Sequence, residues 1–243
     1  MRFPTLRGVI DRRILVNFRV DQQVLSRVLP APFRPRLVHG AGLAGICLIR
    51  LKHIRPRWLP HVGLASENAA HRIAVEWEQN GRWRQGVYIP RRDTSSRLAT
   101  LAGGRLFPGE HHHARFNVAE HYGRYCVEMA SDDGEARLKI EGRVVDHLPA
   151  DSAFGSLGEA SDFFKFGSLG YSVTSEPGVF DGLELRTLNW AVQPMAVEGV
   201  ESSFFGDVRS FPAGSVEFDS ALLMQGIEHE WLSRESLCSW AMS

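Results

Sequence analysis

The segment HRIAVEWEQNGRWRQGVYIP, residues 71–90, contains the clearest local fold signal in the chain. Two strand-like runs flank Asn80-Gly81, the residue pair that type I′ hairpin turns prefer. The segment therefore predicts a β-hairpin from about Ala70 to Ile89.

Further strand-like segments lie on both sides of this hairpin. They cover residues 12–20, 36–54, 110–118, 124–129, 136–147 and several stretches after residue 168, with Pro-Gly or Asp-Gly turn residues between them. Short helices are expected after Asp21, after Asp93 or Thr94, and from about residue 149 to residue 166. The expected fold is mainly β (α+β), a single domain of residues 1–243 that forms an antiparallel, closed or nearly closed β-barrel with two or three short helices.

The second of these helices lies in DTSSRLATLAGGR, residues 93–105. We expect Leu98 and Leu101 to form its apolar face and Gly103-Gly104 to end it.

Composition narrows the functional classes. The chain carries 28 basic and 28 acidic residues, and its formal net charge is zero. Most nucleic-acid-binding proteins instead carry an excess of positive charge. No apolar signal-peptide core is present near the N-terminus, and no run approaches the ~18 apolar residues of a membrane span. We expect a cytoplasmic protein that binds neither nucleic acid nor membranes.

Standard catalytic and cofactor motifs are missing from the sequence. Gly40, Gly42 and Gly45 match the spacing of a dinucleotide-binding loop, but the strand-like ICLIRL follows them where a helix would be required. The three cysteines match no metal or redox spacing. No cofactor is therefore predicted.

The run His111-His112-His113 permits several interpretations. In a strand, His111 and His113 would share one face, about 7 Å apart, and both could reach one metal ion. A metal site needs at least one more ligand, and the alternative is a solvated strand edge. We predict no metal ligand and retain a histidine-cluster metalloprotein as an alternative.

A second cluster lies in ASENAAHRIAVEW, residues 65–77. Strand alternation would place Glu67 and His71 on one face and Arg72 on the other. Glu67 then forms either an acid–base pair in a pocket or a structural ion pair with an arginine.

The order of segments resembles the YqjF-like family of uncharacterised proteins. VDQQVLSRVLP, IRPRWLP, SENAAHRIAVEW and GVYIPRRDTSSRLATLAGGRLFPGEHHHARF carry this resemblance, which covers nearly the whole chain. The resemblance implies an acetoacetate decarboxylase-like barrel, and it is compatible with a homo-oligomer.

In acetoacetate decarboxylases the stretch that corresponds to GGRLFPGEHHH carries a lysine pair, one member of which forms a Schiff base with the substrate. Here Gly109 and Glu110 occupy those positions, and Lys52, Lys139 and Lys165 are far away in sequence. The resemblance thus implies a cavity without imine chemistry, which Gly109 enlarges.

These observations predict a barrel that binds a small carboxylate or keto acid. If it is an enzyme, we expect lyase or isomerase-type proton transfer by Glu67 and His111. We predict that Arg72, Arg97, Arg105, Gly109 and His113 contact the ligand. The alternative from another class is a non-catalytic binding or sensing module.

Overall fold

The computed structural model describes residues 5–58, 63–101 and 108–239, and most of them lie in strands. The strands are β1 (Leu6–Val20), β2 (Arg34–Pro35), β3 (Leu37–Val38), β4 (Ala41–Pro56), β5 (Leu64–Gln79), β6 (Arg82–Thr94), β7 (His112–His121), β8 (Arg124–Ser131), β9 (Arg137–Val144), β10 (Leu169–Val173), β11 (Val179–Thr187), β12 (Gln193–Ser202) and β13 (Val216–Cys238). The helices are α1 (Gln22–Val28), α2 (Arg97–Leu101) and α3 (Leu157–Phe166). The predicted mainly β class with short helices is confirmed.

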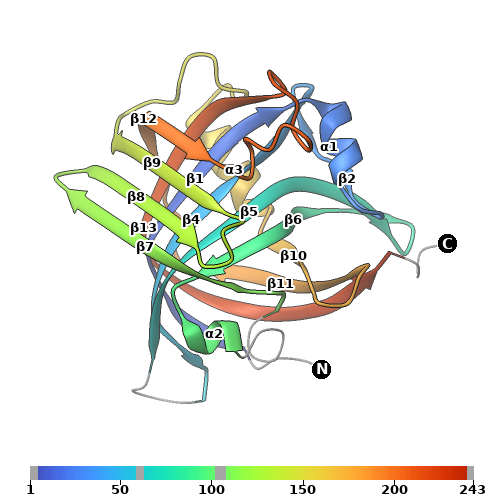
Figure 1. Cartoon of the computed structure of the whole chain (residues 1–243), viewed down its shortest axis with the longest axis horizontal. Coiled ribbons are helices and arrows are strands. Elements are labelled where there is room, and N and C mark those ends of the chain that lie inside the picture. The colour runs from blue at the N-terminus through green and yellow to red at the C-terminus, as the bar shows by residue number, and fades with distance from the viewer. Residues whose placement is uncertain (1–4, 59–62, 102–107, 240–243) are drawn as a thin grey trace.

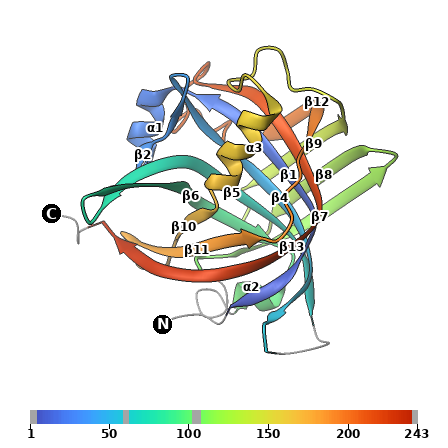
Figure 2. The same ribbon diagram turned by 180° about the vertical axis from the view of Figure 1, so that it is seen from behind.

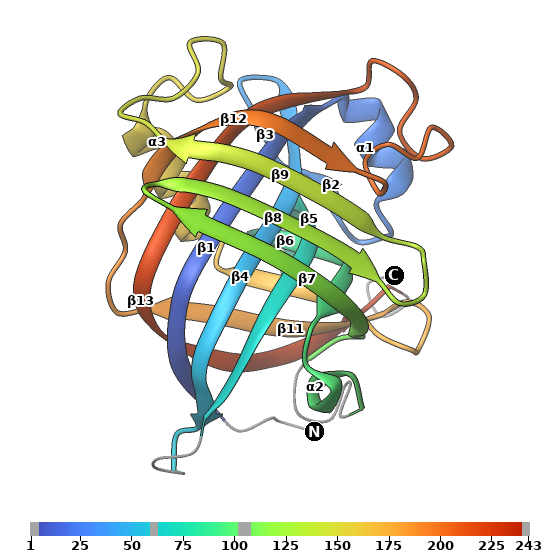
Figure 3. The same cartoon turned by 60° about the vertical axis from the view of Figure 1, so that its left-hand side comes forward.

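The strands join in one 13-stranded sheet that closes on itself twice. Strands β13, β1, β4, β5 and β6 are neighbours in that order and form a central wall. The first ring runs from this wall through β7, β8, β9 and β12, which lie stacked in Figure 3. The second ring is completed by β10 and β11, which curve beneath the wall in Figure 1. All pairings are antiparallel except β6–β7 and β6–β10.

The predicted hairpin is confirmed and is longer than the sequence indicated. Asn80 and Gly81 have φ angles of 54° and 70°, as a type I′ turn requires, and Gln79 pairs with Arg82 across it. Because β5 and β6 belong to both rings, this hairpin sets the register of the central wall.

The helices agree with the sequence to different degrees. Asp21 caps α1 as predicted, since its Oδ1 accepts hydrogen bonds from the backbone N–H groups of Gln23 and Val24. In α2 the predicted apolar face is wrong, because Leu98 and Leu101 are 60% and 85% exposed. The predicted stop at residues 103–104 lies outside the described residues, and α3 begins at residue 157, later than expected.

Side chains of the central wall alternate between two hydrophobic cores. On β1, Ile14 and Val16 face the core of the first ring, whereas Leu15 faces the second core. Helix α3 covers the second core and contributes Ala160 and Phe164 to it. Figure 2 shows α3 in front of the central wall, on the side away from β7 and β8. The two faces of one wall therefore line two different interiors.

Among the described residues, no helix has the length and apolarity needed to cross a membrane.

Two histidines are fully buried in this fold, His71 on β5 and His229 on β13. Burial, with a smaller contribution from Arg91, lowers the pKa of His71 from 6.5 to about 3. Burial lowers the pKa of His229 to about 4. Both side chains are therefore neutral in the folded protein at neutral pH.

This burial predicts loss of stability in mild acid. Well above pH 6.5 neither histidine carries a proton charge in the folded or the unfolded chain. As the pH falls below 6.5, only the unfolded chain gains protons, so each histidine lowers the free energy of unfolding by ~1.4 kcal/mol per pH unit.

Urea unfolding of His71→Phe at pH 7, 6 and 5 tests this effect. The variant is expected to reduce the slope between pH 6 and pH 5 by ~1.4 kcal/mol per unit, whereas His121→Gln, at an exposed position, keeps the slope. An unchanged slope in His71→Phe would contradict the prediction.

Candidate functional site

A cavity lies on the second-ring face of β4, β5 and β6. The space between its lining atoms, with the open mouth included, is about 700 Å³. A second hollow adjoins it and shares six of its lining residues. The shared residues are Cys47, Ile49, Ala70, Arg92, Leu183 and Trp231. We treat the two hollows as one cavity with two ends.

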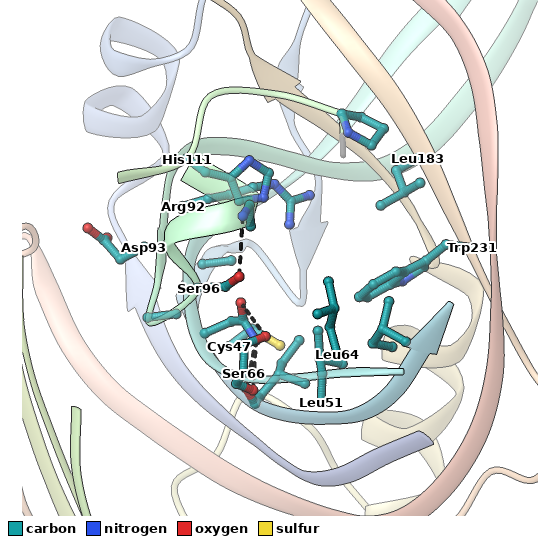
Figure 4. A pocket seen from close by; sticks show the side chains of 17 residues that line it. Cys47, Leu51, Leu64, Ser66, Arg92, Asp93, Ser96, His111, Leu183 and Trp231 are labelled. Carbon is teal, nitrogen blue, oxygen red and sulfur yellow. Dashed lines mark hydrogen bonds between the residues drawn. The ribbon is translucent and has the colours of Figure 1, made fainter. Parts of the chain in front are cut away.

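The ends differ in chemistry. The arginine end is lined by Arg13, Arg72 and Arg92 and by the ring of Phe164. The leucine end is lined by Leu51, Ile54 and Leu64 at the outer parts of β4 and β5. Figure 4 shows His111 and Arg92 on one side of the hollow and Leu183 and Trp231 across from them.

Arg72 is buried at the arginine end without an opposite charge. One guanidinium nitrogen donates a hydrogen bond to Asn17 Oδ1, and the group lies 4.8 Å from the centroid of the Phe164 ring. Its Nε has no hydrogen-bond partner among the described residues. Burial lowers the pKa of Arg72 to about 10, so the side chain is still charged at neutral pH.

Arg92 lies in both parts of the cavity. Its Nε donates a hydrogen bond of 2.8 Å to Ser172 Oγ, and burial lowers its pKa to about 10. Arg13 donates from Nε to Cys47 Sγ at 3.1 Å. In the described part of the chain, none of Arg13, Arg72 and Arg92 forms an ion pair with a carboxylate. Positive charge is thus concentrated and unneutralised at this end.

The acidic residue at the cavity, Asp93, does not neutralise these arginines. Its carboxylate bonds to the guanidinium of Arg91 at 2.8 Å and points away from the hollow in Figure 4. Arg91 also pairs with Asp133, at 2.8 Å.

Glu67 lies on the opposite face of β5 from the cavity. Its carboxylate bonds to Arg12 at 2.5 Å and to Arg50 at 2.6 Å, and both arginines also pair with Glu120 of β7. Of the two interpretations left open by the sequence, the geometry matches the structural ion pair. Strand alternation separates Glu67 from the cavity, so the structure does not bring it together with His111.

The three adjacent histidines point to different partners. His111 lines the cavity, where its Nδ1 lies 3.1 Å from the carbonyl oxygen of Gly109. Burial and the charge of Arg92 lower the pKa of His111 to about 4. His112 and His113 instead pair with Asp133 and Asp132 of the β8–β9 turn, at 3.0 and 2.7 Å. Strand alternation does not place His111 and His113 on one face, because β7 begins at residue 112 and His111 precedes it. His113 therefore does not line the cavity with His111.

No group of three or more metal-ligating side chains is assembled within the described residues.

Gly109 has a different role from the predicted one. Its φ angle is +84°, and an added Cβ would lie 2.4 Å from the Cβ of Ser172. Glycine here permits β10 to approach closely, and it does not enlarge the cavity.

The other predicted ligand residues are distributed differently. Arg72 lines the cavity, Arg97 is exposed on α2, and Arg105 lies outside the described residues. Lys52 bonds to Asp11, Lys139 bonds to Glu141, and Lys165 is exposed on α3. None of these three lysines lines the cavity.

Sequence reasoning missed several lining residues. Arg13, Cys47, Arg92 and Trp231 line the cavity and were not among the predicted ligand contacts. Counting outward from the Asn80-Gly81 turn would have paired Ala70 with Arg91, and only a register shift between His71 and Ile73, which the sequence does not show, pairs Ala70 with Arg92.

Comparisons of structure place this fold among acetoacetate decarboxylase-like proteins. An acetoacetate decarboxylase-like enzyme from Sphingomonas wittichii RW1 is 14% identical in sequence and superposes with a TM-score of 0.55. The match covers 96% of this chain and 91% of that enzyme's chain. The enduracididine biosynthesis enzyme MppR, solved with pyruvate, is 11% identical with a TM-score of 0.58, and the match covers 98% of this chain and 91% of the MppR chain. Acetoacetate decarboxylase from Legionella pneumophila is 10% identical with a TM-score of 0.57, and the match covers 96% of this chain and 88% of the decarboxylase chain.

The family is defined by sequence. Residues 10–174 match the DUF2071 family, described as an uncharacterized conserved protein, and the chain belongs to this family. No curated protein matches the chain. The predicted resemblance, in family and in fold, is confirmed.

The Arg12–Glu67–Arg50–Glu120 network predicts that Glu67 stabilises the fold. Glu67→Gln removes the carboxylate charge that pairs with Arg50 and with the buried Arg12. This substitution is expected to lower the free energy of unfolding by about 3 kcal/mol. Glu217→Gln, which disturbs an exposed pair with Arg19, should change it by less than about 0.5 kcal/mol.

Urea unfolding measures both effects, and titration with carboxylates tests the alternative. If Glu67→Gln kept full stability and lost carboxylate binding, Glu67 would belong to the ligand site, as the sequence predicted.

Proposed function

We propose that this protein binds a small organic carboxylate, such as a 2-oxo acid, between Arg72 and Arg92. One observation carries the proposal: the buried guanidinium of Arg72 and the partly buried guanidinium of Arg92 face one cavity, and neither has a carboxylate partner among the described residues. An anion in the cavity would supply the missing negative charge.

The energetics favour such a ligand. Burial of an unpaired ion costs several kcal/mol, which an ion pair in a desolvated site partly offsets. Arginine also presents parallel N–H groups that match the two oxygens of a carboxylate. Because Arg13 adds a third positive charge beside Cys47, the arginine end favours anions over neutral molecules.

The histidine in the cavity supplies a candidate group for proton transfer. His111 is neutral at neutral pH, and a hydrogen bond from its Nδ1 to the carbonyl of Gly109 makes Nε2 the basic nitrogen. A neutral imidazole beside a bound 2-oxo acid accepts a proton from the carbon next to the carbonyl, and nearby arginines stabilise the enolate. If the protein is an enzyme, we propose lyase or isomerase chemistry of this kind, with His111 acting without Glu67.

Imine chemistry is not part of this proposal. A Schiff base needs a lysine amine at the ligand, and Lys52, Lys139 and Lys165 all lie away from the cavity. The similarity of fold to MppR solved with pyruvate supports a 2-oxo acid as the ligand class, while the lysine positions favour binding without a covalent bond.

Calorimetric titration with pyruvate and propionate tests the proposal. Arg92→Gln keeps a hydrogen-bonding side chain but removes the charge, and it is expected to weaken binding at least tenfold, since a charged hydrogen bond contributes about 1.5–3 kcal/mol. Arg82→Gln removes the same charge at an exposed residue beside the hairpin turn and serves as the matched control.

Binding that is equal in wild type and Arg92→Gln would contradict the proposed site. If the wild-type protein bound neither acid, a short carboxylate such as a 2-oxo acid would be excluded as its ligand.

A further inference from the structure

The cavity is polarised along its length. Its three arginines line the end nearest α3, where Arg72 contacts the Phe164 ring. The leucine end has apolar side chains from both strands, with Ile54 paired to Leu64 across β4 and β5. No arginine other than Arg92 lines this end within the described part of the chain.

The polar side chains of the leucine end already bond to protein. Asn68 donates from its amide to Ser66 Oγ at 2.9 Å and to the backbone oxygens of Ser66 and Ile49 at 3.1 and 3.3 Å. Ser96 Oγ accepts a hydrogen bond from the backbone N–H of Ala99. These groups do not require a polar ligand atom beside them, so an apolar group fits the leucine end without leaving them unsatisfied.

The distance between the ends exceeds the length of a three-carbon acid. Along β4, Cys47, which lines both parts of the cavity, lies four residues from Leu51 of the leucine end, or about 13 Å in an extended strand. Trp231 and Leu183 line both parts of the cavity and form an apolar wall between them. A carboxylate held at the arginine end therefore leaves a long apolar surface uncovered.

We propose that the ligand is an amphipathic carboxylate: its charged head lies between Arg72 and Arg92, and an extended aliphatic or aryl tail lies against Trp231, Leu51 and Leu64. This inference rests on the proposed function and adds the class of the substituent. The tail replaces water along the apolar wall, and the head replaces water at the buried cations.

A chain-length series tests the inference on the full protein. Propionate, butyrate, hexanoate and octanoate are titrated by calorimetry, with pyruvate as the short 2-oxo acid and hexanamide as the neutral analogue of hexanoate. Affinity is expected to rise about threefold to fourfold for each methylene that becomes buried. Hexanamide should bind at least tenfold more weakly than hexanoate, because it lacks the charge.

A matched pair of variants locates the tail. Leu64 lines the cavity and is 41% exposed, whereas Leu98 on α2 is 60% exposed and does not line it. Leu64→Ser is expected to weaken octanoate binding about threefold to tenfold and to leave propionate binding unchanged. Leu98→Ser should change neither.

The outcomes separate the two proposals. If pyruvate or propionate bound but octanoate bound no more tightly, the proposed function would stand and the amphipathic ligand would be excluded. If hexanoate and hexanamide bound with equal affinity, the carboxylate group could not lie between Arg72 and Arg92. If no acid in the series bound, both proposals would fail.

Discussion

The alternation of side chains along β5 is the constraint on which the whole site depends. Because successive residues of a strand point to opposite faces, Glu67 and His71 enter the first ring, while Asn68, Ala70 and Arg72 face the second. The Asn80-Gly81 turn sets the pairing of β5 with β6 as far as Ile73 and Tyr88, and a register shift between His71 and Ile73 then pairs Ala70 with Arg92. A shift of one residue in this register would exchange the contents of the two interiors.

The arginines on the two faces of the central wall differ in whether they are paired with carboxylates. Toward the first ring, Arg12 and Arg50 are neutralised by Glu67 and Glu120, which makes this cluster a structural element. Toward the second ring, Arg72 is buried and Arg92 is partly buried, and neither forms an ion pair with a carboxylate of the described residues. Burial of a guanidinium group without a carboxylate costs free energy, and the proposed anion would offset part of this cost.

Much of the fold follows from local sequence signals. The hairpin turn, the Asp21 cap and the alternating strands were all predictable, because each depends on neighbouring residues alone. Leu98 and Leu101 were misassigned, because an apolar spacing in a five-residue helix does not show whether a surface covers it. The double closure of the sheet depends on β13, whose pairing with β1, β11 and β12 is not encoded locally.

The site was only partly predictable for the same reason. Arg72 and His111 were among the predicted site residues and both line the cavity, and each lies in a segment with unusual polar residues. The run of three histidines suggested one shared site, but His112 and His113 contact the β8–β9 turn, which sequence spacing could not reveal. Arg92, Arg13 and Trp231 reach the cavity from three different strands, so only the tertiary structure shows that they converge.

The most direct test is a crystal structure with 4-bromobenzoate, whose bromine can be located by anomalous scattering. The account predicts a carboxylate between Arg72 and Arg92 and a bromine directed toward Leu51 and Leu64, beside Trp231. A bromobenzoate found beside Arg12 and Glu67, or bound in the cavity with its bromine at the arginines, would contradict it.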